Sequence, residues 1–396
     1  MTTPIYDPAD PTYADRSHDI YRTMRDEHPL YTDPAGRFYA LSRFEDVRNA
    51  CTDWDTFSSV GKQESQYIKV TMNSLDPPRH TAMRALIARG FTPRRVNDLE
   101  DGIRQIARDL LVRFVDEGRG DAIADYAAIL PSVVMGRLIG LSDDEISFCR
   151  ELTDEFMHQT QVHAQHGPAA RSYEVFASVL ERRRAAPEND LMSALLAADI
   201  NGERLTEDEL LGFGWLLLVG GNDTTTNLIG NGLELFFRHP EQRRLLIDQP
   251  ALLPDAVDEV LRIASPTHSL PRVTAIDAAT PYGVIPKGSR VLLLWAAANL
   301  DEREFPDPEH FAIERRAPRH LALGHGVHFC MGASLAKLEA RIAWEEWLRV
   351  LPDYELTEMP QHFVSSTFNG WAALPVASRS GVTGDPTILR ETDGRR

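Results

Sequence analysis

The hydrophobic and polar positions repeat with the period of a helix through the middle of the chain. Between residues 95 and 250, apolar residues recur three and four positions apart, as in VNDLEDGIRQIARDLLVRFVDEG, and this spacing predicts a series of helices. The sequence TEDE at 206–209 has the form of a capping box. It precedes a run that is apolar on nearly every face, which predicts one long buried helix ending near Phe237.

Short alternating segments at the two ends of the chain predict strands. GRFYALS at 36–42 is the first, and after residue 264 the segments SLPRVTA, TPYGVIPKGSRVLLLW, YELTE and GWAALPVAS follow. Helices and strands do not alternate as βαβ units, so the predicted class is mainly α (α+β) with helix dominant. No repeat or linker divides the sequence. We therefore expect a single domain over 1–396, with a loose tail from about residue 380.

Composition excludes several classes of partner. Asp and Glu outnumber Lys and Arg by 59 to 42, a net charge of -17, which argues against binding to nucleic acid or an anionic membrane. The N-terminal sequence has no signal peptide. The apolar run 210–237 is long enough to span a bilayer, but Asn222, Asp223 and three threonines lie inside it, so we interpret it as a buried helix of a soluble protein.

Cysteine usage points to the cytoplasm and singles out one residue. Three widely spaced cysteines do not form a disulfide framework, and Cys51 and Cys149 have the apolar context of core residues. Cys330 is different because it lies in the glycine-rich stretch LALGHGVHFCMGASLAKLEA, directly before a predicted helix. The positive end of that helix would stabilise a thiolate, and the glycines let a bulky partner approach the backbone. With no second cysteine at CxxC spacing, zinc or an iron–sulfur cluster is disfavoured, while a cysteine nucleophile and a plain buried cysteine remain open.

The predicted long helix carries a second candidate site. Asp223 and Thr224 are costly to bury without hydrogen bonds, and Gly220 and Gly221 weaken the helix beside them. A carboxyl and a hydroxyl at a widened turn form a plausible proton relay. The segment 158–172 contains three histidines, but their spacing favours a polar connection over a metal site.

Two further sets of charged residues have weight only in context. Glu259 and Arg262 share a helix face and can pair. His80 and Arg84 lie one turn apart on a helix that begins after Asp76-Pro77-Pro78, and Arg272 follows a proline. Gathered at one site, such cations would hold paired carboxylates.

Together these four features resemble the cytochrome P450 heme-thiolate monooxygenases of the soluble bacterial type, over about 13–376 and in the family's order. The family pattern F-G-x-G-x-H-x-C-x-G is matched by Leu323, Gly324, Gly326, His328, Cys330 and Gly332. The pattern G-G-x-D-T is matched by Gly220, Gly221, Asp223 and Thr224. The pattern E-x-x-R is matched by Glu259 and Arg262, and H-x-x-x-R by His80 and Arg84. LAKLE resembles the family's L-A-x-x-E, and Arg272 matches the arginine after the strand-leading proline.

The resemblance implies a triangular, helix-rich prism that holds heme b (iron protoporphyrin IX) between the long helix and the helix after the cysteine loop. It implies that Cys330 is the axial ligand of the iron, with Gly220 and Gly324 at the cofactor. The propionates would be held by His80, Arg84, Arg272 and His328. Asp223 and Thr224 would deliver protons to O2, whereas Glu259 and Arg262 would be structural.

The resemblance also implies partners. Electrons would come from a ferredoxin and a ferredoxin reductase that draws on NAD(P)H, and we expect a basic docking patch made by Arg94, Arg95, Lys337 and Arg341. The substrate is expected to be a mid-sized, partly polar organic molecule. Its pocket would be lined from the segments 60–75, 156–172, 217–221, 267–271 and 366–370, with Gln66, His158, Thr267, His268 and Asn369 as polar candidates.

Two positions depart from the family pattern. Leu323 stands where a phenylalanine is usual, and His310 stands where an arginine is frequent. The first should change packing beside the thiolate, and the second should change how the Glu259–Arg262 pair is braced.

Two rival functions remain. A peroxide-driven peroxygenase or heme-thiolate isomerase would keep the fold, although members with such chemistry often lack the acid–threonine pair. A heme-binding sensor or other non-catalytic binding protein would not need a costly polar pair inside the long helix.

Overall fold

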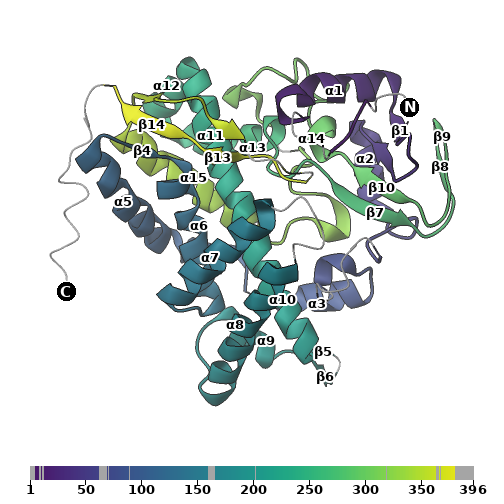
Figure 1. Ribbon diagram of the computed structural model, residues 1–396, viewed down its shortest axis with the longest axis horizontal. Coiled ribbons are helices and arrows are strands. Elements are labelled where there is room, and N and C mark those ends of the chain that lie inside the picture. Colours follow the sequence, from purple (N-terminus) through teal and green to yellow (C-terminus); the bar gives the residue numbers. More distant parts are fainter. Residues whose placement is uncertain are drawn as a thin grey trace.

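The structure is a computed structural model that describes residues 5–8, 10, 13–61, 69, 71–88, 90–158, 166–200, 202–317, 319–362, 365 and 367–379. Its outline is triangular: helices fill most of it, and strands gather on two sides (Figure 1). The helices are α1 (Tyr13–Glu27), α2 (Phe44–Thr52), α3 (Arg79–Ala88), α4 (Pro93–Asn97), α5 (Glu100–Glu117), α6 (Ile129–Ile139), α7 (Asp143–His158), α8 (His166–Ala185), α9 (Leu191–Leu196), α10 (Glu207–Gly221), α11 (Asp223–Arg238), α12 (Pro240–Asp248), α13 (Leu253–Ile263), α14 (Trp295–Ala298) and α15 (Ala333–Val350). Shorter helical turns are η1 (Met72–Ser74), η2 (Ile123–Ala127), η3 (Pro250–Leu252), η4 (Ile313–Arg315) and η5 (Gly326–His328).

The main sheet joins the two ends of the sequence. Its order is β1-β2-β10-β7-β3, and the strands are β1 (Leu30–Thr32), β2 (Tyr39–Leu41), β10 (Arg290–Leu293), β7 (Leu270–Thr274) and β3 (Phe57–Ser58). Strand β10 pairs parallel with β2 and antiparallel with β7, with Val291 opposite Arg272. This pairing fixes Arg272 on a strand that borders the centre of the molecule.

Smaller sheets complete the strand portion. One has the order β11-β14-β4, and the others are the pairs β12-β13, β5-β6 and β8-β9. Their strands are β4 (Arg119–Asp121), β5 (Asp199–Ile200), β6 (Glu203–Arg204), β8 (Ala278–Thr280), β9 (Gly283–Ile285), β11 (Tyr354–Leu356), β12 (Gln361–His362), β13 (Trp371–Ala373) and β14 (Pro375–Ser378).

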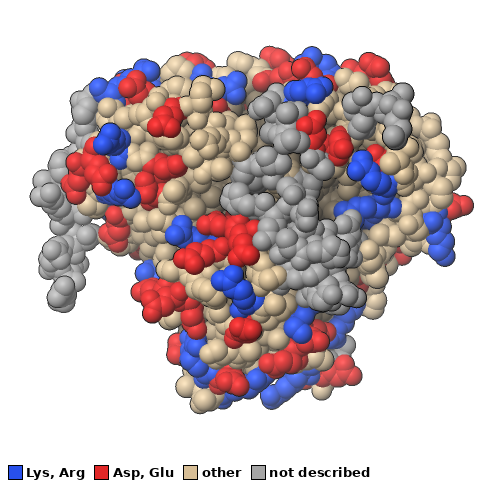
Figure 2. Space-filling view, viewed as in Figure 1, with Lys and Arg blue, Asp and Glu red and all other residues tan. Residues whose placement is uncertain are grey.

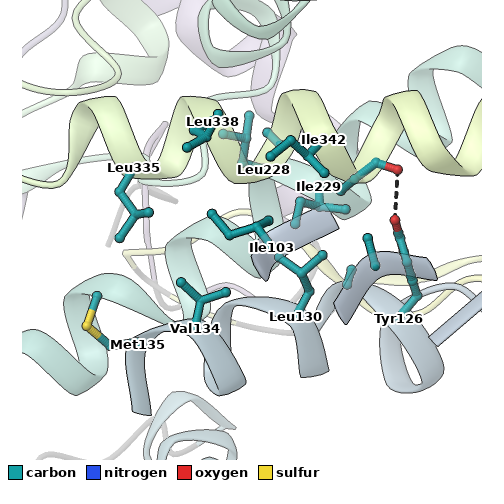
Figure 3. Close-up of a cluster of buried hydrophobic side chains, with 14 of the residues drawn as sticks. Ile103, Tyr126, Leu130, Val134, Met135, Leu228, Ile229, Leu335, Leu338 and Ile342 are labelled. Atoms are coloured by element: carbon teal, nitrogen blue, oxygen red, sulfur yellow. Dashed lines mark hydrogen bonds between the residues drawn. The ribbon is translucent and has the colours of Figure 1, made fainter. Parts of the chain in front are cut away.

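The largest core lies where α5, α6, α11 and α15 pack together. Figure 3 shows side chains of α15, including Leu338 and Ile342, facing Leu130 and Val134 of α6 across Ile103. The Tyr126 hydroxyl donates to the Ala343 carbonyl oxygen at 2.8 Å, so the buried polar atom has a partner. This core anchors α11 and α15, the two helices on either side of the candidate site.

The sequence predicts most elements but not the continuity of the long helix. The fold class is confirmed, as are the strand within 36–42, the helix over 79–87 and the capping box, in which the Glu209 N–H donates to Thr206 at 3.2 Å. The prediction of one unbroken helix from 206 to 237 is wrong, because α10 ends at Gly221 and α11 begins at Asp223. Strands β4, β5 and β6 also lie within the region predicted to be mostly helical.

Other expectations concern the surface and the cysteines. Among the described residues, no helix is long and apolar enough to cross a membrane. Cys51 and Cys149 are buried and no cysteine forms a disulfide, as predicted. On the face shown in Figure 2, acidic and basic side chains are interspersed, so the negative net charge is not gathered into one patch there. The predicted tail, His163, and the side chains of His158 and His166 lie outside the described part of the chain.

Candidate heme-binding site

Thr224 and the predicted cofactor-binding residues other than Gly324 line one cavity of about 270 Å³. It lies between the junction of α10 and α11 on one side and the loop before α15 on the other. Its wall includes these predicted residues: His80, Arg84, Gly220, Thr224, Arg272, His328 and Cys330. They come from α3, α10, α11, β7 and the cysteine loop, which are far apart in the sequence.

The cysteine loop turns tightly so that Cys330 faces this cavity. Gly324 and Gly326 have φ of 70° and 71°, a left-handed conformation that residues with a Cβ rarely adopt. The Cys330 N–H donates to the Leu323 carbonyl oxygen at 2.8 Å and closes the loop. A Cβ at Gly326 would lie 2.8 Å from the Cys51 carbonyl oxygen, so glycine is needed there for space as well.

The start of α15 gives the sulfur a polar environment. The pKa of the Cys330 thiol is raised, because the effect of burial outweighs the lowering effects of the Gly332 N–H, which donates to the sulfur, and of the Arg84 guanidinium. The backbone N–H group and the helix end act on the anionic form of the sulfur. The arrangement suits a thiolate that binds a metal centre.

Arg84 and Arg272 face the cavity without a carboxylate partner among the described residues. No carboxylate of the described residues lies within 4.0 Å of the Arg84 or Arg272 guanidinium, and burial lowers the pKa of both. The rings of His80 and His328 lie 4.2 Å apart between centroids, and His328 Nε2 lies 3.1 Å from Ser59 Oγ. Cations held at a cavity wall favour an anionic ligand, as the propionates of a heme would be.

Glycine also opens the opposite wall. A Cβ placed on Gly220 would meet no atom within 4 Å, so this stretch of α10 presents bare backbone to the cavity. By contrast, a Cβ on Gly221 would lie 2.2 Å from the Met135 side chain, which shows that Gly221 serves helix packing. A thiol on one wall, a flat opening at Gly220 on the other, and cations at the edge together fit a heme.

The Asp223–Thr224 pair is divided between two cavities. The Thr224 side chain lines the large cavity, and its hydroxyl donates to the Gly220 carbonyl oxygen at 2.8 Å. Asp223 instead lines a second cavity of about 170 Å³, together with Arg150 and Asp154 of α7. The structure therefore does not place the carboxyl beside Thr224 in the large cavity.

The Asp223 carboxyl is almost fully enclosed. It is 8% exposed, its Oδ2 atom has no hydrogen-bond partner, and burial followed by the nearby Asp154 raises its pKa well above the ordinary value. Such a carboxyl holds a proton where an exposed aspartate would have lost it. This is the electrostatic property that a proton donor needs.

The Glu259–Arg262 pair is buried and completely hydrogen-bonded. Both side chains are 0% exposed, and two parallel bonds of 2.8 Å join them. Arg262 also donates to the carbonyl oxygens of Asn299 at 3.0 Å and Pro308 at 2.7 Å. The Asn299 Oδ1 atom then accepts from the Leu321 N–H at 2.6 Å, so the pair is connected to the start of the cysteine loop.

Arg315 is a member of this network that the sequence did not reveal. Its Nε donates to Glu259 Oε1 at 3.1 Å, so the carboxylate has a second cation. His310, where an arginine is frequent, offers its backbone carbonyl oxygen to Arg315 at 2.9 Å. The only sequence signal was the adjacent pair Arg315-Arg316, which resembles ordinary surface charge.

The expected substrate-lining residues are only partly confirmed. Thr267 lines the large cavity, and Leu217 to Gly221 contributes Leu217, Gly220 and Gly221. His268 does not line the large cavity. It is 4% exposed, and its Nδ1 atom forms a 2.8 Å hydrogen bond with the Tyr21 hydroxyl. Burial lowers its pKa to about 3. Asn369 does not line the large cavity either, and Gln66 lies outside the described residues.

Comparison with known proteins decides the family. The cytochrome P450 family model matches residues 147–376. The chain is 35% identical over 389 residues to Cytochrome P450 107B1 of Saccharopolyspora erythraea, which covers 93% of this chain and 96% of that protein. The chain belongs to the cytochrome P450 family. It is thus a cytochrome P450 monooxygenase, a class that uses heme and O2.

Other cytochrome P450 proteins agree with the assignment. The chain is 36% identical over 351 residues to the Vitamin D(3) 25-hydroxylase of Pseudonocardia autotrophica, which covers 84% of this chain and 85% of that protein. The solved structure of the cytochrome P450 CYP109Q5 from Chondromyces apiculatus matches with a TM-score of 0.87 and 33% identity, covering 96% of this chain and 99% of that one. The cytochrome P450 fold therefore extends over nearly the whole chain.

The predicted docking patch of this cytochrome P450 is partly neutralised. Lys337 Nζ lies 2.5 Å from Asp258, and Arg341 pairs with Glu100 at 2.8 Å and with Glu345 at 3.3 Å. Arg94 and Arg95 form no ion pair with a described carboxylate. Half of the expected positive charge is thus already paired within the chain.

Proposed function

We propose that the protein is a cytoplasmic heme b monooxygenase that inserts one oxygen atom of O2 into a neutral, mid-sized organic substrate. The overall reaction is R–H plus O2, two electrons and two protons, giving R–OH and H2O. The observation that carries the proposal is that Cys330, the open wall at Gly220, and Arg84 and Arg272 all line one cavity. Neither arginine forms an ion pair with a described carboxylate. When bound, the heme supplies the iron that binds and activates O2.

The residues of the cavity divide the remaining tasks. Cys330 would bind the iron as a thiolate, with the Gly332 N–H stabilising its charge. Arg84, Arg272, His80 and His328 would hold the propionates, and Gly220 would leave room for the cofactor. Thr224 lines the same cavity as these residues.

Proton delivery would start in the second cavity. Asp223 keeps its proton because it is buried, and Arg150 and Asp154 line the same space. From there the proton would pass across α11 toward the hydroxyl of Thr224, a residue that lines the large cavity. A substrate that fills the large cavity excludes water, so this hydroxyl becomes the proton source nearest to the reacting atoms.

The cavity wall favours a neutral, largely apolar substrate with one or two polar groups. Apart from the four propionate-binding residues, the side chains near η1, α10 and β7 are mainly apolar, including Met72, Leu216 and Leu270. Asn73 and Thr267 interrupt this surface. A compound of the size of the vitamin D substrate named for the Pseudonocardia autotrophica relative is of this chemical type.

We propose an external ferredoxin, reduced by NAD(P)H through a ferredoxin reductase, as the electron source. Arg94 and Arg95, which have no described carboxylate partner, are the cations available for an acidic protein. Reversing both charges should slow electron transfer and weaken its dependence on salt. Unchanged rates at low and high salt would remove these residues from the docking surface.

The spectrum of the reduced, CO-treated protein tests the proposed site. A strongly red-shifted Soret band is expected for the wild type and should be lost in Cys330→Ser, because an alkoxide or neutral hydroxyl replaces the thiolate. A wild type without that band, or a Cys330→Ser variant that keeps it, would refute thiolate ligation.

Thr224→Ala separates the O2-dependent function from a peroxide-driven one. An O2-dependent enzyme should release more peroxide per electron pair, because the last proton donor is gone. A peroxide-driven enzyme should keep its peroxide-supported rate and consume no O2 with ferredoxin.

A further inference from the structure

Asn222 occupies the break between α10 and α11. Its φ of -89° and ψ of -72° depart from ideal helix values, and its side chain forms no capping bond to either helix. The backbone still continues across the break, since its N–H donates to Leu218 at 3.1 Å and its carbonyl oxygen accepts from Thr226 at 3.0 Å. The break is therefore a local change of direction between two connected helices.

The Asn222 side chain is held by two neighbouring helices. It is 2% exposed. Its Oδ1 atom accepts from the Ser132 hydroxyl of α6 at 2.5 Å, and its Nδ2 atom donates to the Thr153 hydroxyl of α7 at 2.9 Å. Both hydroxyl residues are themselves buried, at 6% and 0% exposed. A carboxamide fixed at both ends cannot rotate without losing a buried hydrogen bond.

The residues that flank Asn222 face different cavities. Gly220 and Thr224 line the large cavity, whereas Asp223 lines the second one. The Thr153 hydroxyl that accepts from Asn222 also lies beside Asp223, whose pKa it lowers against the larger effect of burial. The same hydroxyl thus connects the position of the break to the carboxyl.

We infer that Asn222 is a positioning residue for proton delivery. By its bonds to Ser132 and Thr153 it fixes how α11 begins, and so keeps the Thr224 hydroxyl in the large cavity and the Asp223 carboxyl in the second. The inference rests on the proposed function, because it assigns Asn222 a role in moving protons to O2.

Asn222→Leu is a clean test because it leaves no donor without an acceptor. The single Ser132 hydroxyl hydrogen is shared between Asn222 Oδ1 and the Ala128 carbonyl oxygen, which lies 2.6 Å from Oγ. The Thr153 hydroxyl donates to the Arg150 carbonyl oxygen at 3.0 Å. Leucine has a similar size, so both hydroxyls keep these bonds while the link to the break is lost. Thr153→Val is the second variant, since it removes one of the two bonds.

Asn231→Leu is the matched control on the same helix. Asn231 is also buried, at 3% exposed, and also forms two side-chain bonds, to the carbonyl oxygens of Ala264 at 3.0 Å and Asn369 at 3.1 Å. It lines neither cavity. It therefore reports the effect of losing a buried carboxamide on α11 without disturbing the break.

The experiment is a single turnover of each holoenzyme in H2O and in D2O. The reduced protein is mixed with O2 in a stopped-flow instrument, and the rate of return to the oxidised spectrum is recorded. We expect Asn222→Leu to change this rate at least threefold and to alter its H2O/D2O ratio, Thr153→Val to change both by less, and Asn231→Leu to match the wild type in both.

The outcomes separate the inference from the proposed function. If Asn222→Leu matches the wild type in rate and isotope ratio, or if Asn231→Leu changes them equally, Asn222 is only structural and the inference is wrong. If Asn222→Leu does not retain heme, Thr153→Val is compared with the wild type and with Asn231→Leu instead, and the same two results would show that the inference is wrong. The CO spectrum of the wild type is the separate check on the proposed function itself.

Discussion

Two buried polar regions of this cytochrome P450 differ in how completely they are paired. Around Glu259 and Arg262, every charge has an opposite charge or a carbonyl oxygen, and both side chains are wholly enclosed. On α11, Asp223 keeps a carboxyl oxygen without a partner, and Glu234 has one cation 3.7 Å away. A complete network holds one geometry, whereas an incomplete one leaves a proton that can be exchanged. The comparison predicts opposite responses to neutralising a carboxyl in each region.

The largest effect on stability is expected from Glu259→Gln. The variant keeps the shape but leaves the buried Arg262 and the partly buried Arg315 without this counter-charge, so the free energy of unfolding should fall by about 3–5 kcal/mol. Urea denaturation of the holoenzyme measures this. Glu355→Gln is the control, because its pair with Arg379 is about half exposed and should contribute less than about 1 kcal/mol. Equal losses in both variants would contradict the comparison.

Glu234 should make stability depend on pH. Burial raises its pKa from 4.5 to about 7, and the native state therefore binds a proton that the unfolded state releases. Its contribution to stability is complete below pH 4.5 and is lost as the pH rises to 7, a loss of about 3 kcal/mol. Glu234→Gln should remove this part of the pH dependence. A wild type and variant whose unfolding free energies change in parallel between pH 4.5 and 7 would show that Glu234 does not titrate there.

Asp223→Asn should separate stability from activity. Since burial raises the pKa of Asp223, the carboxyl stabilises the fold at low pH and does so less as the pH rises, so the amide should be equally stable or up to about 2 kcal/mol more stable at pH 8. Turnover should nevertheless fall about 10²-fold, because the proposed proton donor is lost. Urea denaturation at pH 5 and pH 8 and steady-state turnover measure the two effects. If the variant is less stable than the wild type at pH 8, the Asp223 carboxylate stabilises the fold through partners, as Glu259 does, and the comparison is wrong.

Leu323→Phe should have the smallest effect on stability, within about 1.5 kcal/mol. Leu323 lines the large cavity, and its carbonyl oxygen accepts from the Cys330 N–H. An aromatic ring there should shield the sulfur and shift the reduction potential or the heme retention of the holoenzyme. Identical potentials and heme retention in both proteins would show that this departure from the family pattern has no electronic consequence.

The local pattern was sufficient for most elements of the fold. The capping box fixes the start of α10, the glycines fix the turn around Cys330, and the helix after it begins where the sequence predicts. Pairs such as β4 with β14 could not be predicted, since Arg119–Asp121 becomes a strand only through a partner more than 250 residues later. Arg315 was missed for the same reason, because a carboxylate partner 56 residues away gives no local signal.

The sequence by itself identified the candidate residues for the chemistry: Cys330 within its glycines, the acid–threonine pair, and the cations of α3 and β7. Each is identified by residue type and short-range spacing. Only the tertiary structure decided where they point. It divided Asp223 and Thr224 between two cavities and broke the long helix at Asn222, because the hydroxyls of Ser132 and Thr153 on two other helices bind its side chain. The direction of these side chains depends on hydrogen-bond partners that are distant in sequence, and only the packing of the helices brings those partners together.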